Sequence, residues 1–100
     1  MTDFSLRVIS LITQIPQGKI STYGRIAAMA GAPRGARQVS RLLHSSSRKQ
    51  NLPWHRVVNA TGGIALSGDA GELQRAMLES EGVDFSNTGK VLLSRFLWKP

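Results

Sequence analysis

The fold of this chain is decided by the stretch STYGRIAAMAGAPRGARQVSRLLH, residues 21–44. Ser21 or Thr22 can cap a helix that runs from Tyr23 to about Ala30. A Gly-Ala-Pro segment follows and breaks that helix. The next helix is expected to start near Arg34 and to run to about His44.

The second of these helices has two chemically different faces. Its apolar residues share one arc, and three arginines at i, i+3 and i+7 share the opposite arc. The apolar set is Ala36, Val39, Leu42 and Leu43, and the basic set is Arg34, Arg37 and Arg41. Two short helices around a glycine-containing turn, the second with a basic outer face, are typical of a helix-turn-helix DNA-binding unit. An ordinary helix hairpin with a solvated charged face has the same pattern, so both interpretations stay open.

Helices are also expected on either side of this unit. Residues 4–15 carry an apolar helical stripe, with Thr2 or Asp3 as its cap. A later helix is expected where four residues form one face, and Gly82 closes it. The four are Leu73, Ala76, Met77 and Ser80. The tail beyond this helix is expected to be irregular or partly helical.

Two short β segments are expected between these helices. Val57-Val58 and Ile64-Ala65-Leu66 flank the turn-forming segment Asn59–Gly63, which predicts a small hairpin or wing. The sequence therefore predicts a mainly α, winged-helix-like helix-turn-helix DNA-binding domain with a short β hairpin. At 100 residues, the chain 1–100 is expected to form a single domain.

The charge balance points to a polyanionic partner. The chain has 13 Lys and Arg against 6 Asp and Glu, a formal net charge of +7. After Asp3 no carboxylate occurs until Asp69, so the first two thirds of the chain are almost purely cationic. A one-sided positive field of this kind favours nucleic acid, although a merely soluble basic surface has the same composition.

Several other classes of protein are excluded. The chain has no cysteine, which rules out disulfides, thiolate metal sites and cysteine nucleophiles. His44 and His55 are the only imidazoles, and their spacing matches no metal motif, so no metal and no cofactor are expected. The chain shows neither an apolar run long enough for a membrane span nor a secretory leader, and a cytoplasmic location is expected.

Four blocks in order along the chain carry a resemblance to a known family. They are Ile15–Gly24, Ala36–Val39, Pro53–Val58 and Glu79–Val83, and together they resemble the C-terminal domain of the O6-alkylguanine-DNA alkyltransferases. That family has Pro-Cys-His-Arg-Val in the third block, and here Trp54 stands in place of the cysteine. The family's separate N-terminal domain also has no counterpart. In both features the chain resembles the alkyltransferase-like proteins, which are non-enzymatic relatives of the alkyltransferases.

The resemblance implies that recognition is kept and the reaction is lost. Alkyl transfer from guanine O6 needs a strong nucleophile such as a thiolate, and an indole cannot replace it. His55 and Glu81 match the family's relay that activates the thiol. With no thiol to deprotonate, a structural role remains for them. Arg56 either joins this relay as an ion-pair partner of Glu81 or contacts DNA, and the sequence does not decide between the two.

The resemblance also assigns residues to DNA and to a lesion pocket. Arg37 matches the residue that enters the base stack and fills the gap left by an extruded nucleotide; a solvated or phosphate-bound arginine is the plainer interpretation. Tyr23 matches the tyrosine that pushes on the phosphate behind the flipped base, against a plain core tyrosine. Small side chains such as Ser40 would let the helix enter the minor groove. The remaining phosphate anchors are expected to be Arg34, Arg41, Arg48 and Lys49.

A lesion pocket is expected around Tyr23, Trp54, His55 and Val57. The large π surface of Trp54 can contact the flipped base, and a core tryptophan is the plainer interpretation of that residue. Residues Leu66-Ser67-Gly68 carry no basic side chain where some relatives have one. An added cationic contact to the flipped base is therefore not expected.

The implied function is recognition of O6-alkylguanine in double-stranded DNA by nucleotide flipping, without alkyl transfer. Marking of the lesion for nucleotide excision repair proteins and a monomeric state follow from the same resemblance. One rival is a sequence-specific helix-turn-helix regulator that uses the helix at residues 34–44. Another is a hydrolase built on His55 and Glu81, which would need a serine or water as its nucleophile.

Overall fold

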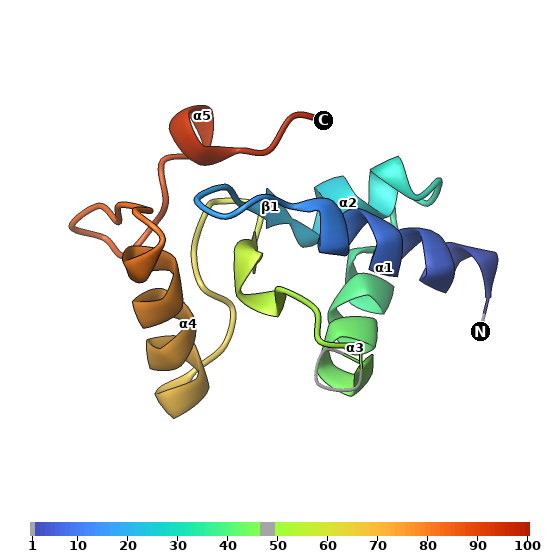
Figure 1. Cartoon of the computed structure of the whole chain (residues 1–100), viewed down its shortest axis with the longest axis horizontal. Coiled ribbons are helices and arrows are strands. Elements are labelled where there is room, and N and C mark those ends of the chain that lie inside the picture. Colours follow the sequence, from blue (N-terminus) through green and yellow to red (C-terminus); the bar gives the residue numbers. More distant parts are fainter. Residues whose placement is uncertain (1, 47–49) are drawn as a thin grey trace.

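The computed structural model describes residues 2–46 and 50–100. Its elements are α1 (Asp3–Gln14), β1 (Ser21–Thr22), α2 (Tyr23–Met29), α3 (Ala36–Ser46), the 3-10 turn η1 (Trp54–Arg56), β2 (Val57–Val58), α4 (Gly68–Ser80) and α5 (Leu93–Phe96). Helices α1, α2 and α3 lie together on one side, α4 lies on the other, and η1 with β2 lies between them (Figure 1). The mainly helical fold class is confirmed.

Threonine side chains begin the first two helices, as expected. Thr2 Oγ1 accepts a hydrogen bond from the Ser5 amide at 3.1 Å, and Thr22 Oγ1 accepts one from the Arg25 amide at 3.1 Å. Each bond satisfies an amide that has no partner within its own helix. The helix expected from Arg34 begins two residues later, so Arg34 lies in the turn that precedes α3.

The β structure differs from the expected hairpin. Strand β2 pairs in parallel with β1, Ser21 opposite Val57 and Thr22 opposite Val58, and residues 64–66 form no strand. The turn at residues 59–63 is present, but its outer edge pairs with the C-terminal segment through the Val91 amide and the Gly62 carbonyl at 2.9 Å. Gly62 has a φ of +89°, and a Cβ at this position would overlap the Val91 carbonyl oxygen. The turn is thus shaped for a distant partner rather than for its neighbour in sequence.

Two apolar clusters form the core, and the β pair lies between them. The first cluster joins α1, α2 and α3 and contains Val8, Ile12, Ile26, Val39, Val57 and Trp98 among others. The second joins α4 to the C-terminal segment and contains Ile20, Val58, Leu78, Val83, Val91 and Phe96. Adjacent residues of β2 point into different clusters, because successive strand side chains point to opposite faces.

The tail returns to the N-terminal half of the molecule. The Ile20 amide donates to the Phe96 carbonyl at 3.0 Å, and the Trp98 amide donates to the Ile20 carbonyl at 2.8 Å. Arg25 Nε also donates to the Trp98 carbonyl at 3.4 Å. These bonds hold the buried Trp98 side chain against the first cluster. The tail was expected to be irregular or partly helical, and α5 with the extended segment after it fits that description.

Helix α4 buries a different face from the expected one. Gly71, Gln74 and Leu78 point inward, whereas Leu73 is 54% exposed. The buried Gln74 amide nitrogen donates to the His55 carbonyl at 3.1 Å and to the Val57 carbonyl at 2.9 Å. A polar residue therefore occupies the core face because it satisfies backbone groups there. Of the helices in the described part of the chain, none is long and apolar enough to span a bilayer.

Candidate nucleic-acid interface

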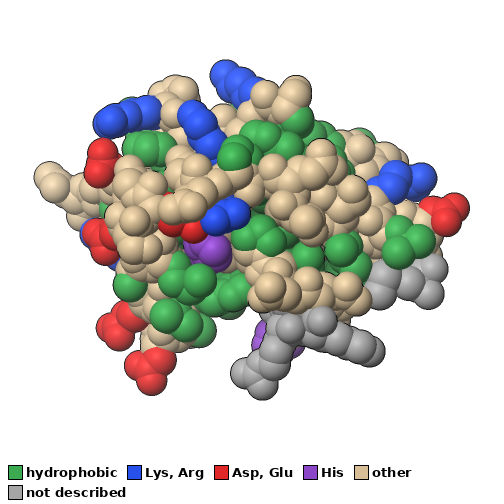
Figure 2. Space-filling model, in the orientation of Figure 1, with side chains coloured by type: hydrophobic (Ala, Val, Ile, Leu, Met, Phe, Trp, Pro, Cys, Tyr) green, Lys and Arg blue, Asp and Glu red, His purple; other side chains and the backbone are tan. Residues whose placement is uncertain are grey.

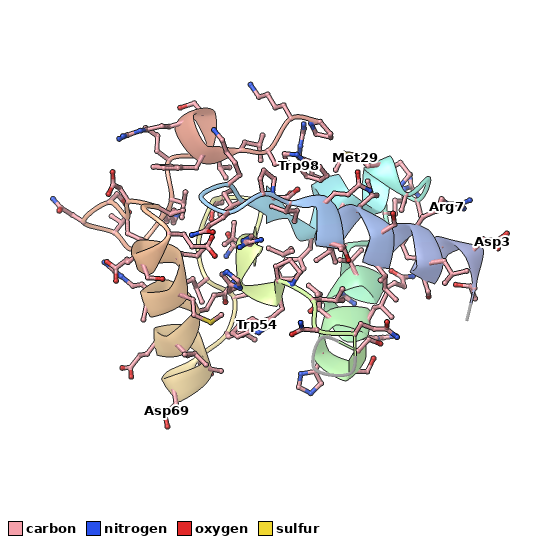
Figure 3. All side chains as sticks on the ribbon, in the orientation of Figure 1. Asp3, Arg7, Met29, Trp54, Asp69 and Trp98 are labelled. Atoms are coloured by element: carbon pink, nitrogen blue, oxygen red, sulfur yellow. The ribbon has the colours of Figure 1, made fainter. Side chains whose placement is uncertain are left out.

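An open cavity of about 1030 Å³ lies between α3 and α4. Trp54, the first residue of η1, stands between these two helices (Figure 3). The cavity is lined by Tyr23, Ser40, Arg41, Leu43, His44, Ser45, Asn51, Leu52, Trp54, Leu66, Ala70 and Leu73. It is therefore large enough to accept a nucleobase beside an aromatic side chain.

The two walls of this cavity differ in chemistry. The α3 wall presents hydroxyl, guanidinium and imidazole groups, from Ser40, Arg41, His44 and Ser45. The wall on the α4 side is apolar, from Leu66, Ala70 and Leu73. Two of these leucines are large exposed hydrophobic residues, Leu66 at 39% and Leu73 at 54%. Exposed apolar side chains that line a cavity indicate a ligand site rather than an incomplete core.

Both aromatic side chains of the cavity are half-buried. Trp54 and Tyr23 pack against the first core cluster on one side and reach the cavity on the other. The Trp54 ring meets the His55 ring edge-on, at 6.1 Å between centroids and an interplanar angle of 82°. Burial raises the pKa of the Tyr23 phenol, so its hydroxyl stays neutral and can donate a hydrogen bond.

The basic face of α3 is exposed and continues to the cavity. Arg37, Ser40 and Arg41 are spaced i, i+3 and i+4, so they share one side of the helix, and all three are exposed. Arg34 is also exposed, in the turn before α3. Within residues 2–46 and 50–100, no carboxylate forms an ion pair with these arginines. Their charges therefore remain available to an external anion.

Glu81 holds η1 in place through hydrogen bonds. Its carboxylate accepts from His55 Nε2 at 2.7 Å, from Arg56 Nη2 at 2.8 Å and from the Gly18 amide at 3.1 Å. Arg56 Nη1 also donates to the Ile15 carbonyl at 2.9 Å. Burial alone would raise the pKa of Glu81, but the hydrogen bonds from Arg56, His55 and Gly18 outweigh it and lower the pKa to about 2. The network ties η1 to α4 and to the end of α1.

Four of the ten expected lesion-pocket and DNA-contacting residues line this cavity. Tyr23, Ser40, Arg41 and Trp54 line it, whereas Arg37 lies on the same α3 face outside the lining. Arg34 lines a smaller hollow at the start of α3. Arg48 and Lys49, the two further phosphate anchors that were expected, lie outside the described residues.

Two expected pocket residues are placed elsewhere. Val57 is 0% exposed, because β2 turns it into the first core cluster, and His55 is buried with its ring held by Glu81. Neither residue lines the cavity. The expectation that His55 and Val57 face a lesion is therefore corrected. Arg56 forms the ion pair with Glu81, which was one of the two alternatives for that residue.

Other residues of the cavity were not expected from the sequence, among them His44, Asn51, Leu66 and Leu73. For His44 a signal exists, because it follows Arg37 by seven residues and therefore shares the basic face. Asn51 has a φ of +53°, an uncommon conformation that is often found at functional sites.

Among residues 2–46 and 50–100, no group of three possible ligands could hold a metal ion.

Comparison with known proteins agrees with this arrangement. The sequence model of the "6-O-methylguanine DNA methyltransferase, DNA binding domain" family matches residues 3–83. The chain is 43% identical to the DNA base-flipping protein of Vibrio parahaemolyticus, over the full length of both. It is 40% identical to Alkyltransferase-like protein 1 of Schizosaccharomyces pombe, with all of this chain and 98% of that protein covered. The chain belongs to the family of this DNA-binding domain.

Solved structures place the chain in the same family and indicate which group of that family it resembles most in fold. S. pombe Atl1 in complex with damaged DNA containing O6-carboxymethylguanine superposes with a TM-score of 0.84 at 36% identity, covering all of this chain and 98% of that one. The O6-methylguanine methyltransferase of Mycobacterium tuberculosis gives 0.64 at 34% identity, covering 81% of this chain and 49% of that one. Within the family, this chain is an alkyltransferase-like protein.

Proposed function

We propose that this protein binds O6-alkylguanine in duplex DNA by drawing the damaged nucleotide into the cavity beside Trp54. The observation that carries the proposal is the position of the indole, which is half-buried in an open cavity next to the basic face of α3. The similarity to a DNA base-flipping protein and to Atl1, which is seen in complex with damaged DNA, supports the same function.

The energies of flipping and stacking are of similar size. Extrusion of a nucleotide costs a few kcal/mol, and contact of a base with an aromatic ring returns about 1–3 kcal/mol. Arg37 can add to this balance, because a planar guanidinium that enters the stack fills the space left by the base. Arg34 and Arg41 hold the flanking phosphates in this proposal.

The proposed binding is not followed by alkyl transfer. An acceptor in this position must be a nucleophile, and the chain has an indole there and no cysteine at all. Glu81 holds His55 Nε2 at 2.7 Å, and His55 Nδ1 has no hydrogen-bond partner among the described residues, so this pair has no thiol to deprotonate. We therefore propose that the protein is not an enzyme, and that the His55, Arg56 and Glu81 network is structural.

The consequence proposed for the cell is recruitment rather than repair. A monomer bound to a flipped lesion would mark the site for nucleotide excision repair proteins, as the resemblance to alkyltransferase-like proteins implies. This step rests on that resemblance.

The test is a titration of two duplexes that differ only in one guanine, either plain or O6-methylated, at a single salt concentration. The methylated duplex is expected to bind more tightly, and Trp54→Ala is expected to remove most of that difference while plain DNA still binds. Leu92→Ala, an exposed leucine outside the cavity, is the matched control. Equal affinity of the unaltered protein for both duplexes would overturn the proposal.

Two further readouts address the rivals. Mass spectrometry of protein and DNA after long incubation should show no methyl group on the protein and an unchanged O6-methylguanine. A sequence-specific regulator would instead protect one particular undamaged site in a footprint, whatever guanine lesion is present. Release of methanol or conversion of the base would support a hydrolase.

A further inference from the structure

His44 lies where the basic face of α3 meets the cavity. It is exposed, it follows Arg37 by seven residues and Arg41 by three, and it lines the cavity together with Arg41. Seven residues are nearly two full helical turns, so these three side chains point in almost the same direction. His44 therefore extends the cationic row of α3 by one more turn.

Among the residues that the structure describes, none that lines the cavity gives His44 a counter-ion. The other ionisable groups that line the cavity are Tyr23 and Arg41, and no carboxylate is among the lining residues. Asp69 and Glu72, the acidic residues in the first turns of α4, both lie outside the lining. Acidic side chains gather over the α4 end of the molecule (Figure 2), and Asp3 lies at the other end (Figure 3).

We propose that His44 binds a DNA phosphate next to the extruded nucleotide, as an imidazolium, and thereby makes DNA affinity depend on pH. This inference rests on the proposed function. A phosphate is the counter-ion that duplex DNA supplies along the whole α3 face. Imidazole is the side chain whose charge ordinarily changes between pH 5 and 8, whereas phosphodiesters and guanidinium groups keep theirs over that range.

The direction of the effect follows from the charge. Proton uptake by His44 adds one cation to the face that meets DNA, so affinity rises as pH falls. An exposed charge-assisted contact of this kind is worth about 1.4- to five-fold in affinity. It should act on damaged and plain duplexes alike, because a phosphate contact carries no information about the base.

The test measures the affinity of the full chain for both duplexes at pH 6.0 and pH 8.0, with His44→Gln and His44→Arg beside the unaltered protein. The unaltered protein should bind more tightly at pH 6.0, by about 1.4- to five-fold. The glutamine variant should bind weakly at both pH values, and the arginine variant tightly at both. His55 is present in all three proteins, so it cannot account for a difference between them.

Salt titrations give a second readout. At pH 8.0, the arginine variant should show a slope of log K against log salt that is steeper than that of the glutamine variant by about 0.9, the value for one phosphate contact. If the glutamine variant keeps the full pH dependence, or if the two slopes coincide, His44 is not a phosphate contact. Loss of lesion preference in the unaltered protein would instead count against the proposed function, and the pH comparison could still be read on plain DNA.

Discussion

At the scale of the residue, Glu81 and Trp54 differ in their surroundings: the Glu81 carboxylate is enclosed by hydrogen-bond donors, and the Trp54 ring faces an open cavity. The Glu81 carboxylate accepts hydrogen bonds from Gly18, His55 and Arg56, while Trp54, the first residue of η1, lines the open cavity. A carboxylate that is largely buried stays ionised only when its oxygens accept hydrogen bonds or pair with a cation. Here the donors come from η1 and from the Gly18 backbone, so the same bonds hold the chain near η1 in place. The side chains of His55, Arg56 and Glu81 thus fix the turn that carries the Trp54 ring.

Glu81 predicts a specific loss of stability in acid. Its pKa is about 2 in the folded protein against 4.5 ordinarily, so the unfolded chain binds the proton more readily. The stabilisation, at most about 3 kcal/mol, is complete above about pH 4.5 and is lost as the pH falls toward 2.

Urea unfolding at pH 7, 4.5 and 3 tests this prediction. Glu81→Gln should lower the urea midpoint of unfolding at pH 7. The difference in midpoint between this variant and the unaltered protein should become smaller as the pH falls. Glu79→Gln, which removes an exposed carboxylate two residues away, is the control and should change little. Parallel acid curves for the unaltered protein and Glu81→Gln would contradict the assignment.

At the scale of the element, helix starts are decided by single side chains. Thr22 closes β1 and caps α2, the helix that packs against both α1 and α3. Thr22→Ala should therefore cost about 1 kcal/mol of unfolding free energy, measured by chemical denaturation. Thr13→Ala, which removes an exposed hydroxyl inside α1, should stay within about 0.5 kcal/mol. Equal losses in both variants would mean that the cap contributes nothing.

The basic face of helix α3 predicts how DNA affinity depends on salt concentration. Arg41→Gln should weaken binding to plain duplex and reduce the salt slope by about 0.9, because one phosphate contact is lost. Arg95→Gln removes the same charge from α5, where Arg95 pairs with Asp84 at 3.3 Å, and should leave the slope unchanged. A similar change in both variants would show that net charge matters rather than the α3 face.

The helices could be predicted from the sequence because their signals are local. Caps at Thr2 and Thr22 and the apolar arc of α3 are all readable within a few residues. The parallel pairing of β1 with β2 was missed, since Ser21 and Val57 are far apart in sequence and a two-residue strand has no periodicity.

The candidate site was predictable where a motif or a helix face marked it, at Tyr23, Arg41 and Trp54. The apolar wall was not, because Leu66 and Leu73 look like ordinary core residues in the sequence. Only the position of Gln74 on the buried face of α4 explains why Leu73 faces the cavity instead. The position of Val57 in the core was not predicted for a similar reason. The direction of its side chain depends on the pairing of β2 with β1, which the sequence does not reveal.

At the scale of the whole molecule, the two core clusters depend on each other through the tail. Trp98 belongs to the first cluster, yet it is carried by the segment that follows α5 of the second. Trp98→Ala should lower the unfolding free energy by about 3–5 kcal/mol, because a large buried side chain leaves a cavity. Urea unfolding measures this, and Leu92→Ala, which is 61% exposed, should have a small effect. A stable Trp98→Ala protein would show that the clusters are independent.

The two tryptophans of this chain also differ in a way that can be seen directly. Trp98 is shielded in the interior, and Trp54 is half-buried in the cavity. A base that stacks on the accessible indole should change its ultraviolet emission, while the shielded indole keeps its own. The protein therefore contains both a reporter and an internal reference, and the arrival of a nucleobase could be timed without any attached dye.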